Sequence, residues 1–230
     1  MRPEELATAH DAWDQRWASE GERSRWIEPV PLVVGLVPLL ESRARVLDLG
    51  CGIGRHAHFL ASNGFTCVGI DGSEVGLTFA RSRAASDGVS VLYRSGVFYD
   101  LGDFEAASFE AVVAWNVIYH GDHDVVQRAE DEIARVLVPG GLLVGSLLSK
   151  RNANYGRGRE VRPDTFVIDD ADDDKVHPHF YCDARGLLDL HRQFEPLELR
   201  DREQTPGAFH WEYLLERARP YPSALYGGPA

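Results

Sequence analysis

The chain has 230 residues, of which 44% are hydrophobic, and its formal net charge is −12. This length suits one α/β domain with additional segments, and the hydrophobic content suffices for a buried core. The negative charge argues against nucleic acid and anionic membranes as partners. Without an apolar run of 18 residues or an apolar signal sequence, we expect neither a membrane span nor secretion. Three scattered cysteines do not suggest a disulfide framework, so the sequence predicts a reduced, cytoplasmic protein.

The first 45 residues predict a helical entry segment. Residues 5–20 are expected to form a helix, with Trp13 and Trp17 on one face at i, i+4 spacing. After a proline-containing extended stretch, a second helix is expected near residues 31–41.

Short apolar runs then alternate with helical segments, and this alternation predicts a mainly parallel sheet covered on both faces. The runs that predict strands are residues 45–49, 66–70, 89–94, 109–117 and 142–149. The segments that predict helices are residues 55–64, 73–88 and 124–141. Ser73 is the expected N-cap of the second of these helices, and Gly88 its stop.

Beyond residue 150 the pattern becomes irregular. Residues 150–182 are polar, and we expect them to be an insertion or lid on the substrate side of a single domain that covers residues 46–218. A short helix at 184–194 precedes two segments joined by Pro206-Gly207, which predict an antiparallel hairpin. No pattern predicts a structure for the tail, residues 219–230.

A glycine loop, Gly50-Cys51-Gly52-Ile53-Gly54, follows the first strand of the predicted sheet. The dinucleotide fingerprint would need its third glycine at Arg55, and no Gly-Lys-Ser/Thr follows as in a P-loop. Asp48 lies two residues before the loop, where its charge would repel a pyrophosphate. We therefore expect a ligand that is neutral or cationic at this loop.

A second acid, Asp71, ends the next strand, where a carboxylate can accept hydrogen bonds from a ribose diol. One acid for a cationic group and one for a ribose, on either side of a glycine turn, fit S-adenosyl-L-methionine. This cofactor has positive ammonium and sulfonium groups and no phosphate.

Four stretches in order resemble the motifs of class I S-adenosylmethionine-dependent methyltransferases: "VLDLGCGIGRH", "VGIDGS", "FEAVVAWNVIYH" and "EIARVLVPGGLLV". The resemblance covers roughly residues 30–150. It implies a Rossmann-like, doubly wound α/β sheet of seven strands, mainly parallel, with a C-terminal antiparallel hairpin.

The resemblance also implies roles for the matching positions. Asp48 and the backbone of Gly50, Cys51, Gly52 and Gly54 would face the methionine end of the cofactor, and Asp71 its ribose. Gly72 and Ser73 would lie beside the adenine, and Trp115 and Asn116 on the sulfonium side. Arg55 would either pair with the cofactor carboxylate or be a solvated residue of the first helical turn.

Members of these families often carry an acid after the third strand, where it accepts a hydrogen bond from the adenine amino group. This sequence departs from that pattern. The best register places Val97 there and Phe98 next, which implies apolar packing and a backbone group around the adenine. Asp100 is the alternative if the register is shifted.

Methyl transfer needs positioning and desolvation above all, and a base only if the acceptor arrives protonated. The candidates for catalysis are His120, Tyr155 and His179, although for His120 the sequence favours a hydrogen bond that shapes the pocket over the role of a base. The substrate-side candidates are His177, Tyr181 and His210. "HGDHD" and "HPHFYC" contain ligand types without the spacing of a known zinc site, so no metal is expected.

"AWDQRW" followed by W-x-E-P is similar to the entry segment of thiopurine- and tellurite-type methyltransferases. Trp13, Trp17 and Trp26 would then form an aromatic lid over the sulfonium, or pack the first helix on the domain, or both.

The sequence thus predicts an S-adenosylmethionine-dependent methyltransferase for a small-molecule acceptor, with no nucleic-acid or membrane partner, as a monomer or homodimer. One alternative is an enzyme that uses the same cofactor for non-methylating chemistry, such as a cyclase or decarboxylase. The other is a non-catalytic binding module.

Overall fold

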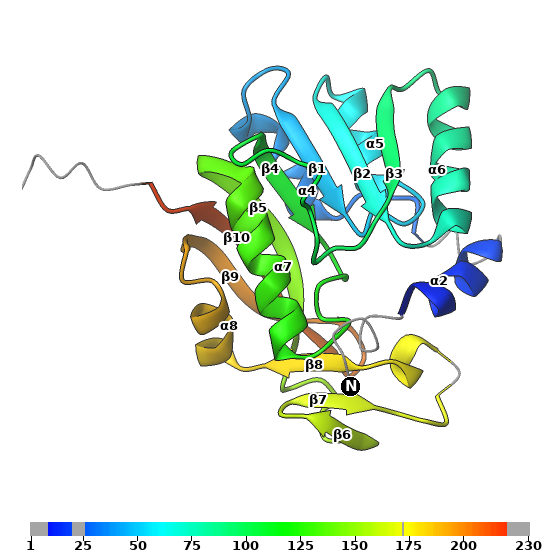
Figure 1. The fold of residues 1–230 in the computed structure, drawn as a ribbon, viewed down its shortest axis with the longest axis vertical. Coiled ribbons are helices and arrows are strands. Elements are labelled where there is room, and N and C mark those ends of the chain that lie inside the picture. Colours follow the sequence, from blue (N-terminus) through cyan, green and yellow to red (C-terminus); the bar gives the residue numbers. More distant parts are fainter. Residues whose placement is uncertain (1–8, 20–25, 172, 220–230) are drawn as a thin grey trace, which may run out of the picture.

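A twisted sheet runs through the middle of the molecule (Figure 1). The computed structural model describes residues 9–19, 26–171 and 173–219. The parallel strands of the sheet are, in spatial order, β3 (Val91–Ser95), β2 (Thr66–Asp71), β1 (Arg45–Leu49), β4 (Phe109–Ala114) and β5 (Leu137–Ser149). Beyond β5 follow, antiparallel, β10 (Ala208–Arg217) and then β9 (Phe194–Thr205). This arrangement is the predicted seven-stranded sheet with its C-terminal hairpin.

Three further strands lie in the region that was expected to be irregular. They are β6 (Arg159–Arg162), β7 (Thr165–Val167) and β8 (His179–Cys182). β8 pairs in parallel with the end of β5, and β7 pairs antiparallel with β8, so the segment extends the sheet past its carboxyl edge. Sequence patterns missed these strands because each has only three or four residues, too few for an alternation to show.

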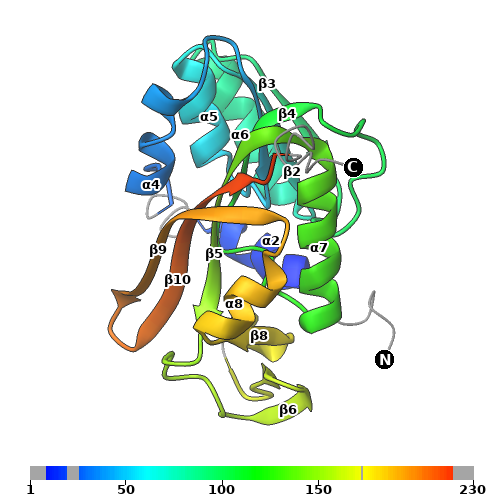
Figure 2. The same ribbon diagram turned by 90° about the vertical axis from the view of Figure 1, so that its left-hand side faces the viewer.

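Helices cover both faces of the sheet, because neighbouring residues of each parallel strand point to opposite sides. In β1, Val46 packs in one core and Leu47 in the other. The first core lies under α4 (Pro31–Val34), α5 (Arg55–Ser62) and α6 (Glu74–Ser86). The second lies under α7 (His123–Val136) and α8 (Ala184–Leu190). Figure 2 shows α4 and α5 on one side of the sheet and α7 on the other.

Local sequence signals explain most helix ends. The Ser73 side chain accepts a hydrogen bond from the Gly76 N–H at 3.0 Å and caps α6, as predicted. The helix expected at 31–41 is instead the short α4 and a 3₁₀ turn (Val37–Leu39), because Gly35 and Pro38 interrupt it. α7 ends at Val136, and β5 begins directly afterwards, several residues before the expected strand.

The N-terminal helix α2 (Ala9–Ala18) falls within the segment predicted to be helical. Residues 5–8 and 20 of that prediction, and residues 220–230 of the predicted tail, lie outside the described residues. Within the described ranges, no helix has the length and apolar character needed to cross a membrane.

A buried ion pair joins α7 to the C-terminal part of the chain. Glu130 of α7 is fully buried, and its Oε1 lies 2.9 Å from Nε2 of His191, which follows α8. The Tyr213 ring of β10 packs edge-on against the imidazole, with 4.7 Å between ring centroids. Burial alone would lower the pKa of His191, but the charge and hydrogen bond of Glu130 outweigh it and raise this pKa above its ordinary value.

Because the pKa of His191 is raised in the folded state, the stability from this pair is complete below the unfolded pKa of about 6.5 and is lost as the pH rises through the folded value. We expect His191→Gln to cost about 3 kcal/mol at low pH, since it leaves a buried carboxylate unpaired, and less above neutral pH. Urea unfolding of the variant and wild type at about pH 6 and about pH 9 measures this difference. His123→Gln, at an exposed histidine, should show no such pH-dependent difference.

Candidate functional site

A cavity opens at the carboxyl edge of the sheet, where the ends of β1, β2 and β4 meet. Most of the residues predicted for the site line it: Trp13, Trp17, Trp26, Gly50, Gly52, Arg55, Asp71, Gly72, Val97, Phe98, Trp115, Asn116 and His120. The fold brings these residues together from the N-terminal segment, the glycine loop and the ends of β2, β3 and β4. An open α/β sheet commonly binds its ligand at this edge.

The glycine loop has backbone angles that only glycine adopts without strain. Gly50 has φ 65°, and Gly52 has φ 51°. A Cβ atom on Gly52 would lie 2.9 Å from Cζ2 of Trp17, so the absence of a side chain lets the tryptophan rest on the loop. The Cys51 side chain is buried behind the loop, and burial raises the pKa of its thiol, which therefore stays neutral.

Asp71 connects the glycine loop to the start of α6. Its Oδ2 accepts a hydrogen bond from the Gly52 N–H, and its Oδ1 accepts one from the Ser73 N–H, each at 2.7 Å. A carboxylate has about four acceptor directions, so it can take two backbone donors and still accept from a ligand hydroxyl. Asp71 also lines the cavity, as expected for a ribose-binding acid.

Asp48 lies beneath the cavity and does not line it. Its side chain is only 2% exposed, and its Oδ2 accepts a hydrogen bond from the Ala57 N–H in the first turn of α5 at 2.9 Å. Its Oδ1 lies 3.8 Å from Nδ1 of His56. The carboxylate therefore stabilises the N-terminus of α5. We predicted that Asp48 would face the ligand, but its side chain points under α5 and not into the cavity. Gly54, with φ 76°, is the N-cap of the same helix.

Arg55 is the first residue of α5, and its guanidinium lies over the ring of Trp26, 4.9 Å from the ring centroid. Arg55 is partly buried and lines the cavity. Burial lowers the pKa of Arg55 to about 10, partly offset by Asp48, so the side chain keeps its positive charge at neutral pH. The site thus presents one fixed cation to an anionic group of a ligand.

Three tryptophans form an aromatic roof over the cavity. The ring centroids are 5.0 Å apart for Trp13 and Trp17, 5.8 Å for Trp13 and Trp26, and 6.2 Å for Trp17 and Trp26. The helix that carries the first two, α2, lies beside the start of α6 (Figure 1). There the Ser73 hydroxyl donates a hydrogen bond to Oδ1 of Asp14 at 2.5 Å. The tryptophans therefore line the cavity and their helix packs on the domain, while a place over the sulfonium stays a prediction.

Asn116 follows β4 and has a left-handed backbone, with φ 56°. Its N–H donates to Oγ of Ser146 at 2.9 Å, and the same hydroxyl donates to the Asn116 side-chain oxygen at 2.7 Å. Asparagine is among the few residues that tolerate this conformation, and such strain concentrates at functional sites. Ser146 of β5 therefore fixes the direction of an amide that lines the cavity.

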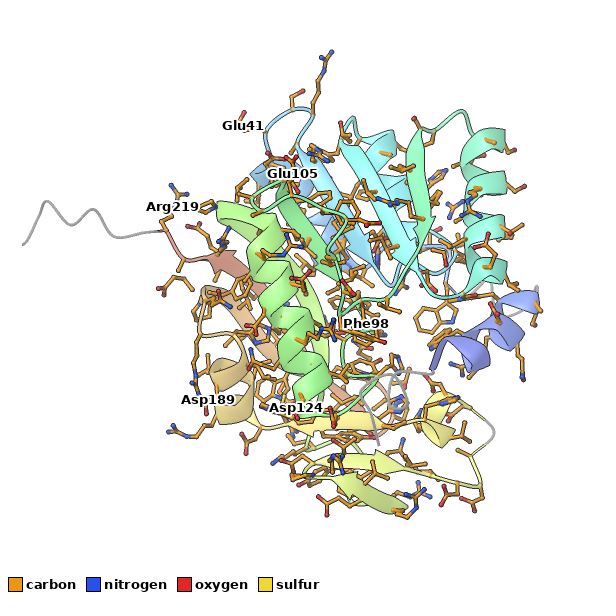
Figure 3. All side chains as sticks on the ribbon, viewed as in Figure 1. Glu41, Phe98, Glu105, Asp124, Asp189 and Arg219 are labelled. Atoms are coloured by element: carbon orange, nitrogen blue, oxygen red, sulfur yellow. The ribbon has the colours of Figure 1, made fainter. Side chains whose placement is uncertain are left out.

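On the opposite wall, Val97 and Phe98 line the cavity in the segment after β3, and Figure 3 labels Phe98 between α7 and α2. The alternative residue, Asp100, is exposed, and its Oδ2 lies 3.6 Å from a guanidinium nitrogen of Arg128. Asp100 does not belong to the cavity lining. The apolar register is therefore the one that reaches the site.

The candidate residues on the substrate side fall into two groups. His120 lines the cavity, and the ring of His179 packs edge-on against it, with 4.7 Å between ring centroids. The Tyr155 hydroxyl donates to Oδ1 of Asp164 at 2.8 Å, and its ring packs against Tyr181. The predicted residues outside the cavity lining are Asp48, Cys51, Gly54, Ser73, Tyr155, His177, His179, Tyr181 and His210.

His120 is buried and neutral at physiological pH. Burial and the neighbouring His179 lower the pKa of His120 to about 3, against a smaller opposing effect of Asp174. A neutral imidazole can accept a proton or bind a metal ion, although a base of such low pKa is weak.

Sequence reasoning missed several residues of the cavity wall: Ile53, His56, Ile70, Gly96, Tyr99 and Val117. Each is adjacent in sequence to a predicted site residue or lies within two positions of one, so the motifs marked the correct segments. Sequence reasoning also missed that Asp14 binds the Ser73 hydroxyl. The one sequence feature that pointed to it is an acid between Trp13 and Trp17.

Comparison with known proteins identifies the central part of the chain. Residues 46–141 match the family described as "Methyltransferase domain". The chain is 33% identical over 152 residues to the ubiquinone biosynthesis O-methyltransferase of Hahella chejuensis, across 64% of this chain and 60% of the relative. The chain thus spans about 60% of the length of the curated relatives it matches.

Two solved structures share the fold. One is the Burkholderia thailandensis 1,6-didemethyltoxoflavin-N1-methyltransferase with bound 1,6-didemethyltoxoflavin and S-adenosylhomocysteine, at a TM-score of 0.72 and 18% identity, over 95% of this chain and 91% of that one. The other is an S-adenosylmethionine-dependent methyltransferase from Methanosarcina mazei, at 0.69 and 20%, over 84% and 100%. These structures confirm the predicted fold class, and the domain match covers residues 46–141.

The contact between Gly52 and Trp17 predicts the effect of an added methyl group. Gly52→Ala should cost about 2–3 kcal/mol, because it strains a left-handed backbone and displaces a buried ring. Tryptophan fluorescence should shift to longer wavelength, because Trp17 is only 6% exposed in the native protein.

Gly64→Ala is the matched control. Gly64 also has a positive φ, 91°, but no atom lies within 4 Å of an added Cβ. It should lower stability by about 1 kcal/mol and leave the fluorescence maximum unchanged. Equal effects of the two substitutions on unfolding and fluorescence would contradict the described packing.

Proposed function

We propose that the chain transfers a methyl group from S-adenosyl-L-methionine to a small-molecule acceptor, because residues 46–141 match a methyltransferase domain. The observation that carries this proposal is the roofed cavity at the carboxyl edge of the sheet. Its wall combines a glycine loop, an acid at the end of β2 and the Trp115-Asn116 pair after β4.

The donor groups of the cavity fit the parts of this cofactor. Asp71 accepts from the ribose hydroxyls, and the close approach allowed by Gly50 and Gly52 brings the backbone to the methionine part. The charged guanidinium of Arg55 pairs with the cofactor carboxylate. The adenine packs against Val97 and Phe98, and the aromatic roof faces the sulfonium. Asp48 acts indirectly, through the first turn of α5.

When bound, the cofactor supplies a methyl carbon activated by its sulfonium, and its thioether leaves without an acid. The chain's own residues therefore have to align the acceptor and exclude water. The three tryptophans exclude water from above, and Ser146 holds the Asn116 amide in one direction. His120, which is neutral, orients the acceptor or takes its proton.

The acidic chain, with a net charge of −12, supports a small molecule over a nucleic acid as substrate. The O-methyltransferase name of the curated relatives favours an oxygen acceptor. A cytoplasmic location and a monomeric or homodimeric state complete the proposal, as the sequence composition suggested.

Calorimetry with S-adenosylhomocysteine tests the cofactor site. We expect wild type to bind and Asp71→Asn to bind ~10–100-fold more weakly, because a charged acceptor is worth about 1.5–3 kcal/mol. Asp103→Asn, at an exposed acid paired with Arg94, is the matched control and should bind like wild type. If wild type does not bind, or if Asp71→Asn binds equally well, the assignment of this cavity is wrong.

Transfer of a labelled methyl group separates the proposal from its alternatives. Wild type is incubated with methyl-labelled cofactor and a metabolite extract, and the small-molecule fraction is analysed by mass spectrometry. We expect the label in a small molecule. A product without label would indicate non-methylating chemistry, and binding without any product would indicate a binding module.

A further inference from the structure

Two histidines and an aspartate meet in a buried cluster beside the cavity. His120 follows β4, Asp174 begins the 3₁₀ turn η2 (Asp174–Val176), and His179 begins β8. Their exposures are 4%, 5% and 3%. Nε2 of His120 lies 4.0 Å from Oδ2 of Asp174, and Nε2 of His179 lies 3.7 Å from the same oxygen. The three facing atoms all lie within 4.8 Å of one another.

The cluster leaves the buried imidazole of His120 without a hydrogen-bond partner among the described residues. Distances of 3.7 and 4.0 Å are too long for hydrogen bonds. Nδ1 of His179 lies 2.9 Å from the His177 carbonyl oxygen, to which it can only donate. This contact fixes the ring so that Nε2 of His179 is the nitrogen that faces Oδ2 of Asp174.

We propose that His120, Asp174 and His179 bind a divalent transition-metal ion through these three facing atoms. Two imidazoles and one carboxylate are a ligand set of zinc, iron(II) and related ions. Ligand atoms at about 2.0–2.2 Å from such an ion are roughly 3.3–3.5 Å apart in a tetrahedron, so small side-chain movements close the site. His120 also lines the cavity, so the cluster adjoins it.

The surroundings of the cluster hold the ligands in the required direction. The His177 carbonyl fixes the ring of His179 through the other nitrogen, which is the usual outer contact of a metal-binding histidine. Nζ of Lys175 lies 3.6 Å from Oδ1 of Asp174, which leaves Oδ2 to the histidines. The sequence predicted no metal site because the ligands come from two distant motifs, "HGDHD" and "HPHFYC", and from the acidic stretch before the second.

Direct measurement of bound metal tests this proposal. Tag-free protein is stripped with a chelator, titrated with zinc chloride by calorimetry, and analysed for metal after gel filtration. We expect wild type to retain about one ion per chain, and His179→Ala and Asp174→Asn to bind at least ~100-fold more weakly. Substitution with cobalt(II) should give the visible absorption of a site with nitrogen and oxygen ligands.

His123→Ala is the matched control, since His123 also adjoins an acid, Asp124, but on the exposed surface at the start of α7 (Figure 3). It should bind zinc like wild type. If His179→Ala fails to fold by circular dichroism, the isosteric Asp174→Asn carries the test.

The proposal is overturned if wild type retains no ion, or if Asp174→Asn retains as much as wild type. Because the readout is bound metal, failure of this proposal leaves the proposed methyl transfer untouched, and failure to transfer methyl leaves the metal measurement valid.

Discussion

The carboxylate of Asp71 is the point on which the cavity depends. It holds the backbone N–H groups of Gly52 and Ser73 at once, and so fixes the glycine loop against the start of α6. Ser73 then caps that helix and binds Asp14 of the roof helix. Through these contacts, Asp71 positions the glycine loop and the start of α6 directly, and the tryptophan-bearing helix α2 through Ser73.

Much of the fold was predictable because its parallel strands are apolar, regular and bounded by turns, and the four motifs marked the correct edge of the sheet. Asp48 shows the limit of that reasoning. Asp48 precedes the first glycine by two residues, which predicted that it faces the ligand at the loop. The strand instead directs its side chain under α5, and the direction of a side chain cannot be derived from the distance in sequence. The strands β6–β8 escaped prediction because each has only three or four residues. Asp174 ends the acidic stretch 169–174, a composition that is typical of a solvated loop, but its side chain is buried.

An acidic chain that buries several carboxylates has to compensate each of them. Asp48 and Asp71 receive backbone N–H groups at helix starts, whereas Glu130 pairs with a histidine. Asp174 differs, because its nearest partners on Oδ2 are two histidine nitrogens beyond hydrogen-bond distance. Asp48, Asp71 and Glu130 are therefore compensated by groups of the fold itself, whereas Asp174 is the carboxylate that we propose to bind a metal ion.

The Ser73 hydroxyl has two separate contacts, and they differ in what they hold together. It accepts from the Gly76 N–H, which belongs to α6 itself, and it donates to Asp14, which belongs to the roof helix. The first contact lies within α6 and the second joins α6 to α2. The cap of α6 therefore does not depend on the contact with α2, and loss of Asp14 would leave the first turn of α6 capped.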